Sequence, residues 1–399
     1  MKYVVILGDG MADYPVAELD GKTPLAYAKT PVMDELAGKG VVGLAYTIPE
    51  GMSPGSDTAN LAVLGYNPKV YYTGRSPLEA LSIGVAMKET DIALRCNIVT
   101  LSEEEPYGQK TILDHSSGEI STEDAAILLE AVREELENDF YKFYVGTSYR
   151  HLTIWENGAV TELTPPHDIL GKTIGDYLPK EEMLRRMMEK SYDILNEHPI
   201  NLERARKGRN KANSIWFWGA GTKPVLASFE EKTGKRGVMI SAVDLLKGIA
   251  IGAGMKVVQV EGADGTLHTN YEGKAQAAVD SLLTDGCDFA YIHVEAPDEM
   301  GHQGSLEKKL TAIEYLDARV IKPVKEKLDA AGVEYRMLIT PDHPTPIALR
   351  THVAEPVPFL LYDSTKEQKR IGCYNEKEAA DSGVVIKNGY ELIDRLLDE

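Results

Sequence analysis

The sequence predicts an α/β protein with a doubly wound, mostly parallel sheet and an inserted α+β domain. The first observation is an apolar run rich in β-branched residues at 3–7, which ends at a glycine. The second is a set of similar runs late in the chain, at residues 256–260, 289–294, 335–340 and 357–362. The third is that amphipathic helical stretches separate these runs. Such runs are typical of strands buried on both faces, and their alternation with helices is typical of doubly wound sheets.

Two of these helices are predicted over residues 273–284 and 306–331. Their apolar residues recur at the spacing of a helix that buries one face. The strand–helix alternation over residues 235–399 therefore continues the fold that the N-terminal strand begins. We assign residues 1–73 and 222–399 to one discontinuous domain.

The middle of the chain has a different pattern, which predicts a separate α+β domain over residues 74–221. Its predicted antiparallel strands cover residues 91–99, 140–145 and 151–155. Its predicted helices cover residues 121–138, where Ser121 suits an N-cap, and residues 180–198.

The composition is that of an acidic globular protein. Of its 399 residues, 43% are hydrophobic and 26% are charged, and the formal net charge is −19. This charge argues against nucleic acid or an anionic membrane as a partner. A protein this acidic that binds phosphates must hold them with local cations, either metal ions or converging Arg and Lys side chains.

The cysteines and the N-terminus indicate a reducing, cytoplasmic environment. Cys96, Cys287 and Cys373 are isolated in the sequence, so they form neither a disulfide framework nor a CxxC pair. The apolar run at residues 3–7 is too short for a signal-peptide core. No stretch approaches the roughly 18 apolar residues of a membrane span.

Metal-binding residue types follow the predicted strands. Asp9 comes directly after the first strand, and Asp342 and His343 come after the strand at residues 335–340. The carboxyl ends of parallel strands meet at one edge of a sheet, where ligands bind in such folds. A turn is the ordinary explanation of the Asp9-Gly10 pair, so Asp9 alone leaves both interpretations open.

A further pair of candidate ligands lies on a predicted helical turn. Asp298 and His302 follow the strand at residues 289–294 and are four positions apart, which places both side chains on one face. Together with the later His352, the candidates supply three carboxylates and three imidazoles, enough for two metal ions: Asp9, Asp298, His302, Asp342, His343 and His352. Oxygen and nitrogen donors without thiolate suit Mn²⁺ or Zn²⁺ better than Mg²⁺ or copper.

Ser56 is the candidate nucleophile. Pro54 and Gly55 precede it, and a predicted helix begins there and continues through Leu64. A helix N-terminus favours an anion, but serine is also a common N-cap, and the local pattern leaves both open. Two metal ions about 3.5–4 Å apart could bind the entering and leaving oxygens of a phosphoryl transfer. They would also lower the pKa of a coordinated hydroxyl, so that Ser56 needs no histidine base.

Short motifs are distributed over nearly the whole chain. They are Gly8-Asp9-Gly10-Met11-Ala12-Asp13, Leu64-Gly65-Tyr66, Tyr72-Thr73-Gly74-Arg75, Arg95-Cys96-Asn97, Tyr149-Arg150-His151, Trp216-Phe217-Trp218-Gly219, Ala242-Val243-Asp244-Leu245, Thr269-Asn270-Tyr271-Glu272-Gly273-Lys274 and Ala296-Pro297-Asp298-Glu299-Met300-Gly301-His302. With these motifs the sequence resembles the alkaline phosphatase superfamily and, within it, the cofactor-independent phosphoglycerate mutases of the archaeal type. The resemblance implies an alkaline-phosphatase-type fold whose inserted domain closes over the substrate, and interconversion of 3-phosphoglycerate and 2-phosphoglycerate.

The resemblance also implies a role for each candidate ligand. One metal ion would be held by Asp9, Ser56, Asp342 and His343, and the other by Asp298, His302 and His352. Ser56 would carry the phosphoryl group during the reaction. We expect two divalent ions, with Mn²⁺ favoured and Zn²⁺ or Co²⁺ as alternatives.

The candidate substrate contacts lie in the inserted domain, at Arg75, Asn97, His115, Arg150 and His151. Arginine is suitable because its planar guanidinium matches both phosphate and carboxylate. The alternative to substrate contact is that these candidate residues form surface ion pairs with nearby glutamates. Two other features are interpreted as structural. We expect the basic segment at residues 204–211 to be a solvated face, and we expect Trp216 and Trp218 to pack at the domain junction.

The sequence does not decide which molecule accepts the phosphoryl group. The segment at residues 341–346, followed by residues 350–358, resembles a bacterial branch for which a homoserine kinase role has been proposed. No P-loop or kinase glycine loop is present, so ATP would have to donate through Ser56. Hydrolysis and a catalytically silent metal- or phosphate-binding protein are the remaining alternatives. The large insertion favours a shielded transfer over open hydrolysis.

Overall fold

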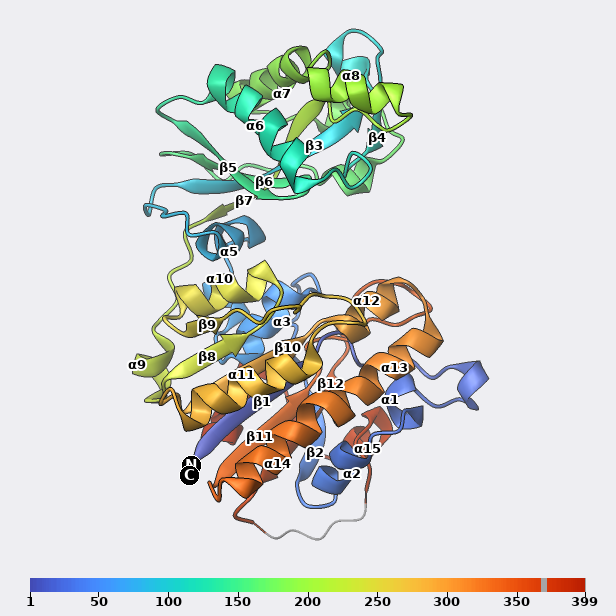
Figure 1. Cartoon of the computed structure of the whole chain (residues 1–399), viewed down its shortest axis with the longest axis vertical. Coiled ribbons are helices and arrows are strands. Elements are labelled where there is room, and N and C mark those ends of the chain that lie inside the picture. The colour runs from blue at the N-terminus through green and yellow to red at the C-terminus, as the bar shows by residue number, and fades with distance from the viewer. Residues whose placement is uncertain (367–371, 399) are drawn as a thin grey trace. The chain divides into compact units, whose positions relative to one another are not determined.

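The computed structural model describes residues 1–366 and 372–398 (Figure 1). The chain divides into two compact units. The first, which we call the discontinuous unit, consists of Met1–Tyr72 and Val225–Glu399. The second, Thr73–Pro224, is the inserted unit. Each unit has its own sheet and its own hydrophobic core.

A mixed sheet forms the centre of the discontinuous unit. In spatial order its strands are β13 (Val385–Ile386), β2 (Val41–Ala45), β12 (Val357–Asp363), β11 (Tyr335–Thr340), β1 (Lys2–Gly8), β10 (Phe289–Val294), β8 (Gly237–Ile240) and β9 (Lys256–Val258). β12 runs antiparallel to both of its neighbours, and the other neighbouring strands run parallel. The prediction of an α/β fold with a mostly parallel sheet is confirmed.

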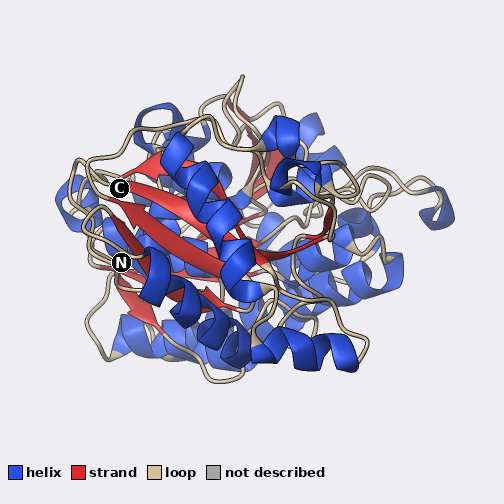
Figure 2. Ribbon diagram, turned by 90° about the horizontal axis from the view of Figure 1, so that it is seen from above, coloured by secondary structure: helices blue, strands red, loops and turns tan. Residues whose placement is uncertain are grey.

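Helices cover this sheet. Every residue of β10 and β11 is buried, so both faces of these strands are covered. In Figure 1, α11 and α14 lie across the front of the strands, and Figure 2 shows helices around the strands from above. The helices of this unit are α1 (Pro24–Tyr27), α2 (Pro31–Ala37), α3 (Ser56–Val63), α4 (Pro68–Tyr71), α9 (Phe229–Thr233), α10 (Asp244–Gly252), α11 (Tyr271–Leu283), α12 (Ala296–His302), α13 (Leu306–Leu316), α14 (Lys322–Ala330), α15 (Glu376–Asp381) and α16 (Leu392–Leu397). Within the described part of the chain, no helix is long and apolar enough to cross a membrane.

Three strands of this sheet, β2, β8 and the two-residue β13, were not predicted from the sequence. β8 is only four residues long, too short for a distinct apolar run. β2 contains Gly43, where a Cβ would lie 2.8 Å from the ring of Phe359 in the neighbouring β12. This glycine makes room for a large neighbour but weakens the strand pattern that can be recognised from sequence.

The predicted helix over residues 306–331 is divided by a π-helical turn, Asp317–Ile321, which joins α13 to α14. Pro323 explains the wider turn, because proline lacks an N–H group and its ring clashes with the carbonyl four residues earlier. The buried Asp317 carboxylate accepts hydrogen bonds from two backbone N–H groups in α2. The turn therefore also connects this long helical stretch to α2.

The inserted unit contains an antiparallel sheet and its own helices. The strands β4 (Ile112–Asp114), β3 (Ile92–Leu101), β6 (Arg150–Trp155) and β5 (Tyr141–Thr147) are neighbours in that order, and β7 (Ser214–Thr222) also pairs with β3. The helices are α5 (Arg75–Ser82), α6 (Thr122–Leu136), α7 (Glu182–Leu195) and α8 (Pro199–Arg206). As predicted, Ser121 is the N-cap of α6, where its hydroxyl accepts from the N–H of Asp124. One face of the sheet shares a core with α6 and α7, and the other has a smaller cluster with α5.

Of the two structural interpretations in the inserted unit, the solvated face is largely confirmed and the domain-junction packing is wrong for Trp216. Residues 205–210 are exposed, as predicted for a solvated face, whereas the Arg204 guanidinium is buried and donates to the carbonyl oxygens of Ser117 and Asn210. Trp216 lies in the core of the inserted unit, where its indole N–H donates to the Thr164 carbonyl. In both residues a buried polar group is satisfied by backbone, which sequence alone does not reveal.

Candidate metal centre

The candidate ligands of the discontinuous unit meet at the carboxyl edge of its sheet. Asp9 follows β1, Asp342 and His343 follow β11, and α12 follows β10. These three parallel strands are neighbours, with β1 in the middle, so their ends lie together. Possible ligand atoms of Asp9, Asp342 and His343 lie within 4.8 Å of one another, as do those of Asp298, His343 and His352.

The first group consists of Asp9, Asp342 and His343 around the Ser56 hydroxyl. Ser56 Oγ lies 3.4 Å from Asp9 Oδ2 and 3.2 Å from His343 Nε2. His343 Nε2 is 3.6 Å from Asp9 Oδ1 and 3.4 Å from Asp342 Oδ2. The carboxylates and the imidazole are buried. Four side chains thus direct polar atoms at one small volume.

Asp9 shows that this volume suits a cation. Its Oδ1 is buried and has no hydrogen-bond partner, which is costly for a carboxylate oxygen. Burial raises the pKa of Asp9 well above its usual value, and the neighbouring Asp342 and Asp298 raise it further. A divalent cation would contact the unpaired oxygen and offset the repulsion, so the first group fits a metal ion.

The second group consists of Asp298, His302 and His352. His302 Nε2 lies 3.1 Å from Asp298 Oδ2 and 3.0 Å from His352 Nε2. His352 Nε2 lies 3.4 Å from Asp298 Oδ1. His302 Nδ1 lies 3.0 Å from the Arg350 carbonyl oxygen. Since a carbonyl oxygen can only accept a hydrogen bond, Nδ1 carries the proton and donates it. In neutral His302 the Nε2 lone pair is therefore available to a metal ion.

Asp298 controls the protonation of the second group. Its hydrogen bond to His302 raises the pKa of that imidazole to about 9. Although burial opposes the effect, hydrogen bonds from His302 and His352 hold the pKa of Asp298 well below its usual value. Without a metal ion His302 is a cation at neutral pH, and metal binding at this group must displace its proton.

Ser56 is held by the helix that it begins. It occupies the first position of α3, and Gly55 is the N-cap, so the N-cap interpretation of this serine is wrong. Asn60, one turn later, donates to the Ser56 carbonyl at 2.8 Å and to Asp342 Oδ2 at 2.9 Å. The Tyr291 hydroxyl donates to Asn60 Oδ1 at 2.6 Å and fixes the amide. Asn60 was not predicted as a site residue, although its four-residue spacing from Ser56 places it one helical turn away.

His293 was not predicted as a site residue either. A single histidine inside an apolar strand does not by itself indicate a functional site. It is buried in β10, and its Nε2 donates to Asp9 Oδ2 at 2.9 Å. Ser241 Oγ lies 3.1 Å from the other ring nitrogen. Burial lowers the pKa of His293 to about 3, so the ring is a neutral donor. His293 therefore orients Asp9 without neutralising it.

In the inserted unit, four of the five candidate substrate contacts lie around one face of the sheet. Asn97 and Arg150 are opposite each other on β3 and β6. Asn97 accepts from the Trp218 indole at 3.0 Å and donates to the His115 carbonyl at 3.2 Å. Arg75 stands at the start of α5, which packs against β3 and β7.

Arg95, His167 and Trp218 belong to the same region and were not predicted as site residues. The Arg95 guanidinium stacks 4.5 Å from the Trp218 ring centroid, and the His167 ring meets Trp218 edge-on at 5.2 Å. Arg95 and Arg75 share one carboxylate oxygen of Glu79, at 3.0 and 3.1 Å. Burial lowers the pKa of Arg95 to about 10, and the charges of neighbouring arginines add to the shift. We call Arg75, Arg95 and Arg150 the arginine cluster.

His151 does not join the arginine cluster. Successive strand residues point to opposite faces, so His151 lies with Cys96 on the face that packs against α6 and α7. It is buried, and its Nδ1 accepts from the Gly146 backbone at 3.1 Å. Burial lowers the pKa of His151 to about 4. This environment does not support the predicted substrate contact at His151.

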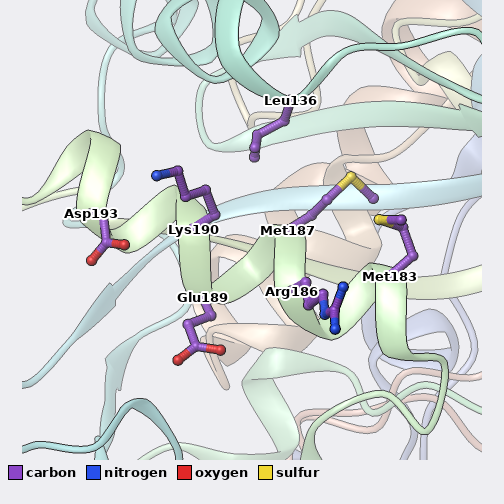
Figure 3. A pocket seen from close by; sticks show the side chains of 7 residues that line it. All are labelled: Leu136, Met183, Arg186, Met187, Glu189, Lys190 and Asp193. Atoms are coloured by element: carbon purple, nitrogen blue, oxygen red, sulfur yellow. The ribbon is translucent and has the colours of Figure 1, made fainter.

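A groove elsewhere on the inserted unit has a different character. It has a volume of about 390 Å³ and lies between α7 and the end of α6 (Figure 3). Its lining residues are Leu136, Met183, Arg186, Met187, Glu189, Lys190 and Asp193. Figure 3 shows Glu189 directed away from Leu136, while Lys190 leaves the opposite side of α7. Because its charges have both signs, this groove is a weaker anion site than the arginine cluster.

Known proteins with similar sequences share one description. The family described as 2,3-bisphosphoglycerate-independent phosphoglycerate mutase matches residues 37–201. A Geobacter sulfurreducens protein named probable 2,3-bisphosphoglycerate-independent phosphoglycerate mutase is 49% identical over 403 aligned residues, covering 100% of both chains. A Methanosarcina barkeri protein named 2,3-bisphosphoglycerate-independent phosphoglycerate mutase is 50% identical over 98% of both chains.

Solved structures share the fold over the whole chain. A protein from Pyrococcus horikoshii has a TM-score of 0.81 at 30% identity, covering 100% of this chain and 96% of that chain. The cofactor-independent phosphoglycerate mutase from Thermoplasma acidophilum has a TM-score of 0.67 at 27% identity, covering 100% and 99%.

Replacing His302 should change how the stability of the metal-free protein depends on pH. The pKa of His302 is raised to about 9 in the folded protein, against about 6.5 in an unfolded chain. Protonated His302 therefore stabilises the fold fully below about pH 6.5, and this contribution is lost as pH rises toward 9. We expect the Tm difference between wild type and His302→Gln, measured with chelator, to shrink over this range.

The matched control is His268→Gln, at an exposed histidine of the same unit. Its Tm difference from wild type should stay constant over the same range. A constant difference for His302→Gln as well would contradict the pairing of His302 with Asp298.

Proposed function

The chain belongs to the 2,3-bisphosphoglycerate-independent phosphoglycerate mutase family, and we propose that it transfers the phosphoryl group through Ser56. The reaction interconverts 3-phosphoglycerate and 2-phosphoglycerate, in keeping with the names of its relatives. The protein is accordingly an isomerase that works by phosphoryl transfer.

The observation that carries the proposal is the position of the Ser56 hydroxyl. It lies between Asp9 Oδ2 and His343 Nε2, at the first residue of α3. The N-terminus of a helix favours the negative charge that a phosphorylated serine would carry. Because Asn60 holds both the Ser56 backbone and Asp342, the nucleophile and a ligand candidate keep a fixed relation.

Two divalent metal ions fit the residues around Ser56. We assign one ion to Asp9, Ser56, Asp342 and His343, and the other to Asp298, His302 and His352. The donor set favours Mn²⁺, with Zn²⁺ and Co²⁺ as alternatives. When bound, the ions supply positive charge for the phosphoryl oxygens and lower the pKa of the Ser56 hydroxyl.

The reaction has two transfers at Ser56. In the first, Ser56 Oγ forms a bond to phosphorus while the bond between phosphorus and one substrate hydroxyl oxygen breaks. That oxygen takes up the proton that Ser56 releases. After the glycerate turns, its other hydroxyl forms the bond to phosphorus and returns the proton, and the bond to Ser56 breaks. No water and no second donor are consumed, as an isomerisation requires.

We assign binding of the glycerate to the inserted unit and its arginine cluster. Arg75 and Arg150 are exposed, so their guanidinium groups can meet a phosphate or carboxylate. Arg95 is buried and adds a further positive charge that interacts with both. Asn97 and His115 border the same face. A protein with a net charge of −19 needs such a local concentration of cations to hold an anionic substrate.

Transfer to homoserine from ATP and transfer to water are the competing reactions at the same centre. Incubating the purified protein with Mn²⁺ and 3-phosphoglycerate should yield 2-phosphoglycerate. Homoserine with ATP should yield no phosphohomoserine. Production of phosphohomoserine, or of inorganic phosphate alone, would overturn the mutase assignment.

The proposed substrate is a small phosphorylated metabolite of the cytoplasm. The proposal includes no nucleic acid and no membrane as a partner.

Ser56→Ala should abolish the mutase reaction, because no other hydroxyl would carry the phosphoryl group. Wild type incubated with labelled 3-phosphoglycerate and quenched in acid should contain phosphoserine at position 56, and the variant should not. The Tm should stay close to that of wild type, since the Ser56 hydroxyl is not used as a helix cap. A variant that keeps a substantial fraction of activity would rule out the phosphoserine route.

Arg150→Ala should reduce mutase activity by about 10²-fold, equivalent to about 2.7 kcal/mol of transition-state stabilisation. Slow hydrolysis of a generic phosphate ester should survive, because the Ser56 centre lies in the other unit. Arg133→Ala, at a half-buried helix arginine that pairs with Glu130 and Glu137, is the matched control and should retain full mutase activity. Equal loss of both reactions in Arg150→Ala would show that Arg150 supports the metal centre instead.

A further inference from the structure

Thr345 lies between the two groups of metal-ligand candidates. It follows His343 by two residues and is fully buried. Its Oγ1 is 2.5 Å from Asp298 Oδ1, in the second group, and 3.2 Å from His343 Nδ1, in the first group. One hydroxyl therefore contacts a ligand candidate of each proposed metal ion.

The direction of each hydrogen bond follows from the number of protons. A threonine hydroxyl has one proton, and an ionised carboxylate can only accept, so Thr345 donates to Asp298. Its oxygen must then accept from His343, which places the imidazole proton on Nδ1. The lone pair of neutral His343 is consequently on Nε2. That nitrogen faces Ser56, Asp342 and Asp9.

The surrounding structure holds Thr345 in this position from several sides. Lys309 Nζ donates to the Thr345 carbonyl at 2.8 Å and to Asp13 Oδ2 at 2.7 Å. The Thr345 N–H donates to the Ala12 carbonyl at 3.2 Å. These contacts fix the backbone of Thr345 and leave its hydroxyl for the two ligand candidates.

Gly10 shows how closely this region is packed. It has a positive φ of 59°, a conformation that glycine adopts without strain. A Cβ at this position would lie 2.5 Å from both Thr345 Oγ1 and Asp298 Oδ1. Glycine at position 10 therefore leaves the space that the Thr345–Asp298 hydrogen bond occupies.

We propose that Thr345 is a positioning residue that couples the two metal sites, by selecting the Nδ1–H tautomer of His343 and orienting Asp298 with the same hydroxyl. The inference rests on the metal pair of the proposed function. Removing the hydroxyl leaves His343 Nδ1 and Asp298 Oδ1 each without this partner. His343 can then adopt the other tautomer, and Asp298 can rotate, so both sites lose affinity together.

The test is titration of the metal-free protein with Mn²⁺ by calorimetry. Thr345→Val keeps the side-chain shape but removes the hydroxyl, and Thr345→Ser keeps the hydroxyl. Wild type should bind two ions, and Thr345→Val should bind both about 10- to 100-fold more weakly, as is typical when a group that orients a ligand is lost. Thr345→Ser should remain within a few-fold of wild type at both sites.

Thr340→Val is the matched control. It removes another buried threonine hydroxyl, one that donates to the Pro341 carbonyl. This variant is expected to lower the Tm without weakening Mn²⁺ binding. Weakening as large as that in Thr345→Val would show that loss of any buried hydroxyl here is enough, and would overturn the proposal.

A spectroscopic measurement keeps the proposal testable if Thr345→Val does not fold. Long-range ¹H–¹⁵N spectra of metal-free wild type with ¹⁵N-labelled histidine, at pH 8, report which nitrogen of each imidazole carries the proton. His343→Gln assigns the His343 signals. The proton is expected on Nδ1, and a proton on Nε2 would overturn the tautomer assignment.

The outcomes separate this inference from the proposed function. If wild type binds two ions and Thr345→Val weakens neither or only one of them, the coupling is wrong and the metal pair stands. If wild type binds fewer than two ions, the metal pair fails and the coupling fails with it.

Discussion

The convergence of three carboxylates at one sheet edge is the constraint on which the rest of the centre depends. Asp9, Asp298 and Asp342 come from the ends of neighbouring parallel strands or the helix that follows, so the fold itself brings like charges together. Burial and mutual repulsion raise the pKa of Asp9 and make the ionised, metal-free edge costly. Asp9 Oδ1 is left without a hydrogen-bond partner, and the hydrogen bond to Asp298 keeps His302 cationic.

Neutral donors orient these carboxylates. The donors are His293 for Asp9, Asn60 for Asp342 and Thr345 for Asp298. Each restricts the rotation of a carboxylate without adding a positive charge, so the carboxylate keeps its attraction for a cation. The buried Lys309 contacts a carbonyl and Asp13 instead of a ligand candidate. The positive charge of Lys309 is therefore kept off the oxygens that would bind metal.

The inserted unit has the opposite electrostatic character at its proposed substrate face. Glu79 balances Arg75 and Arg95 through a single oxygen, and Arg150 adds a further positive charge nearby. The aromatic rings of Trp218 and Tyr149 hold two of these guanidinium groups by cation–π contacts. The arrangement concentrates cations in a protein whose overall charge is strongly negative, which is the local condition that binding an anionic metabolite requires.

The sequence by itself determined the features that depend on short spacing along the chain. Continuous apolar runs indicate buried parallel strands, so Asp9, Asp342 and His343 could be recognised as residues at strand ends. The four-residue spacing of Asp298 and His302 likewise follows from helix geometry. β2 and β8 could not be recognised in this way, because short strands depend on pairing with neighbours more than on their own pattern.

Only the tertiary structure decided which groups orient the ligand candidates and which residues face the substrate. The local sequence indicates only that His293 belongs to an apolar strand, and its contact with Asp9 spans 284 positions of the chain. Thr345 contacts Asp298 across 47 positions. Whether Arg150 or His151 joins the arginine cluster depends on which face of β6 each residue occupies, and a two-residue motif does not contain that information. These contacts arise when strands and helices distant in sequence pack together, because the partner that gives each polar group its role is absent from the local sequence.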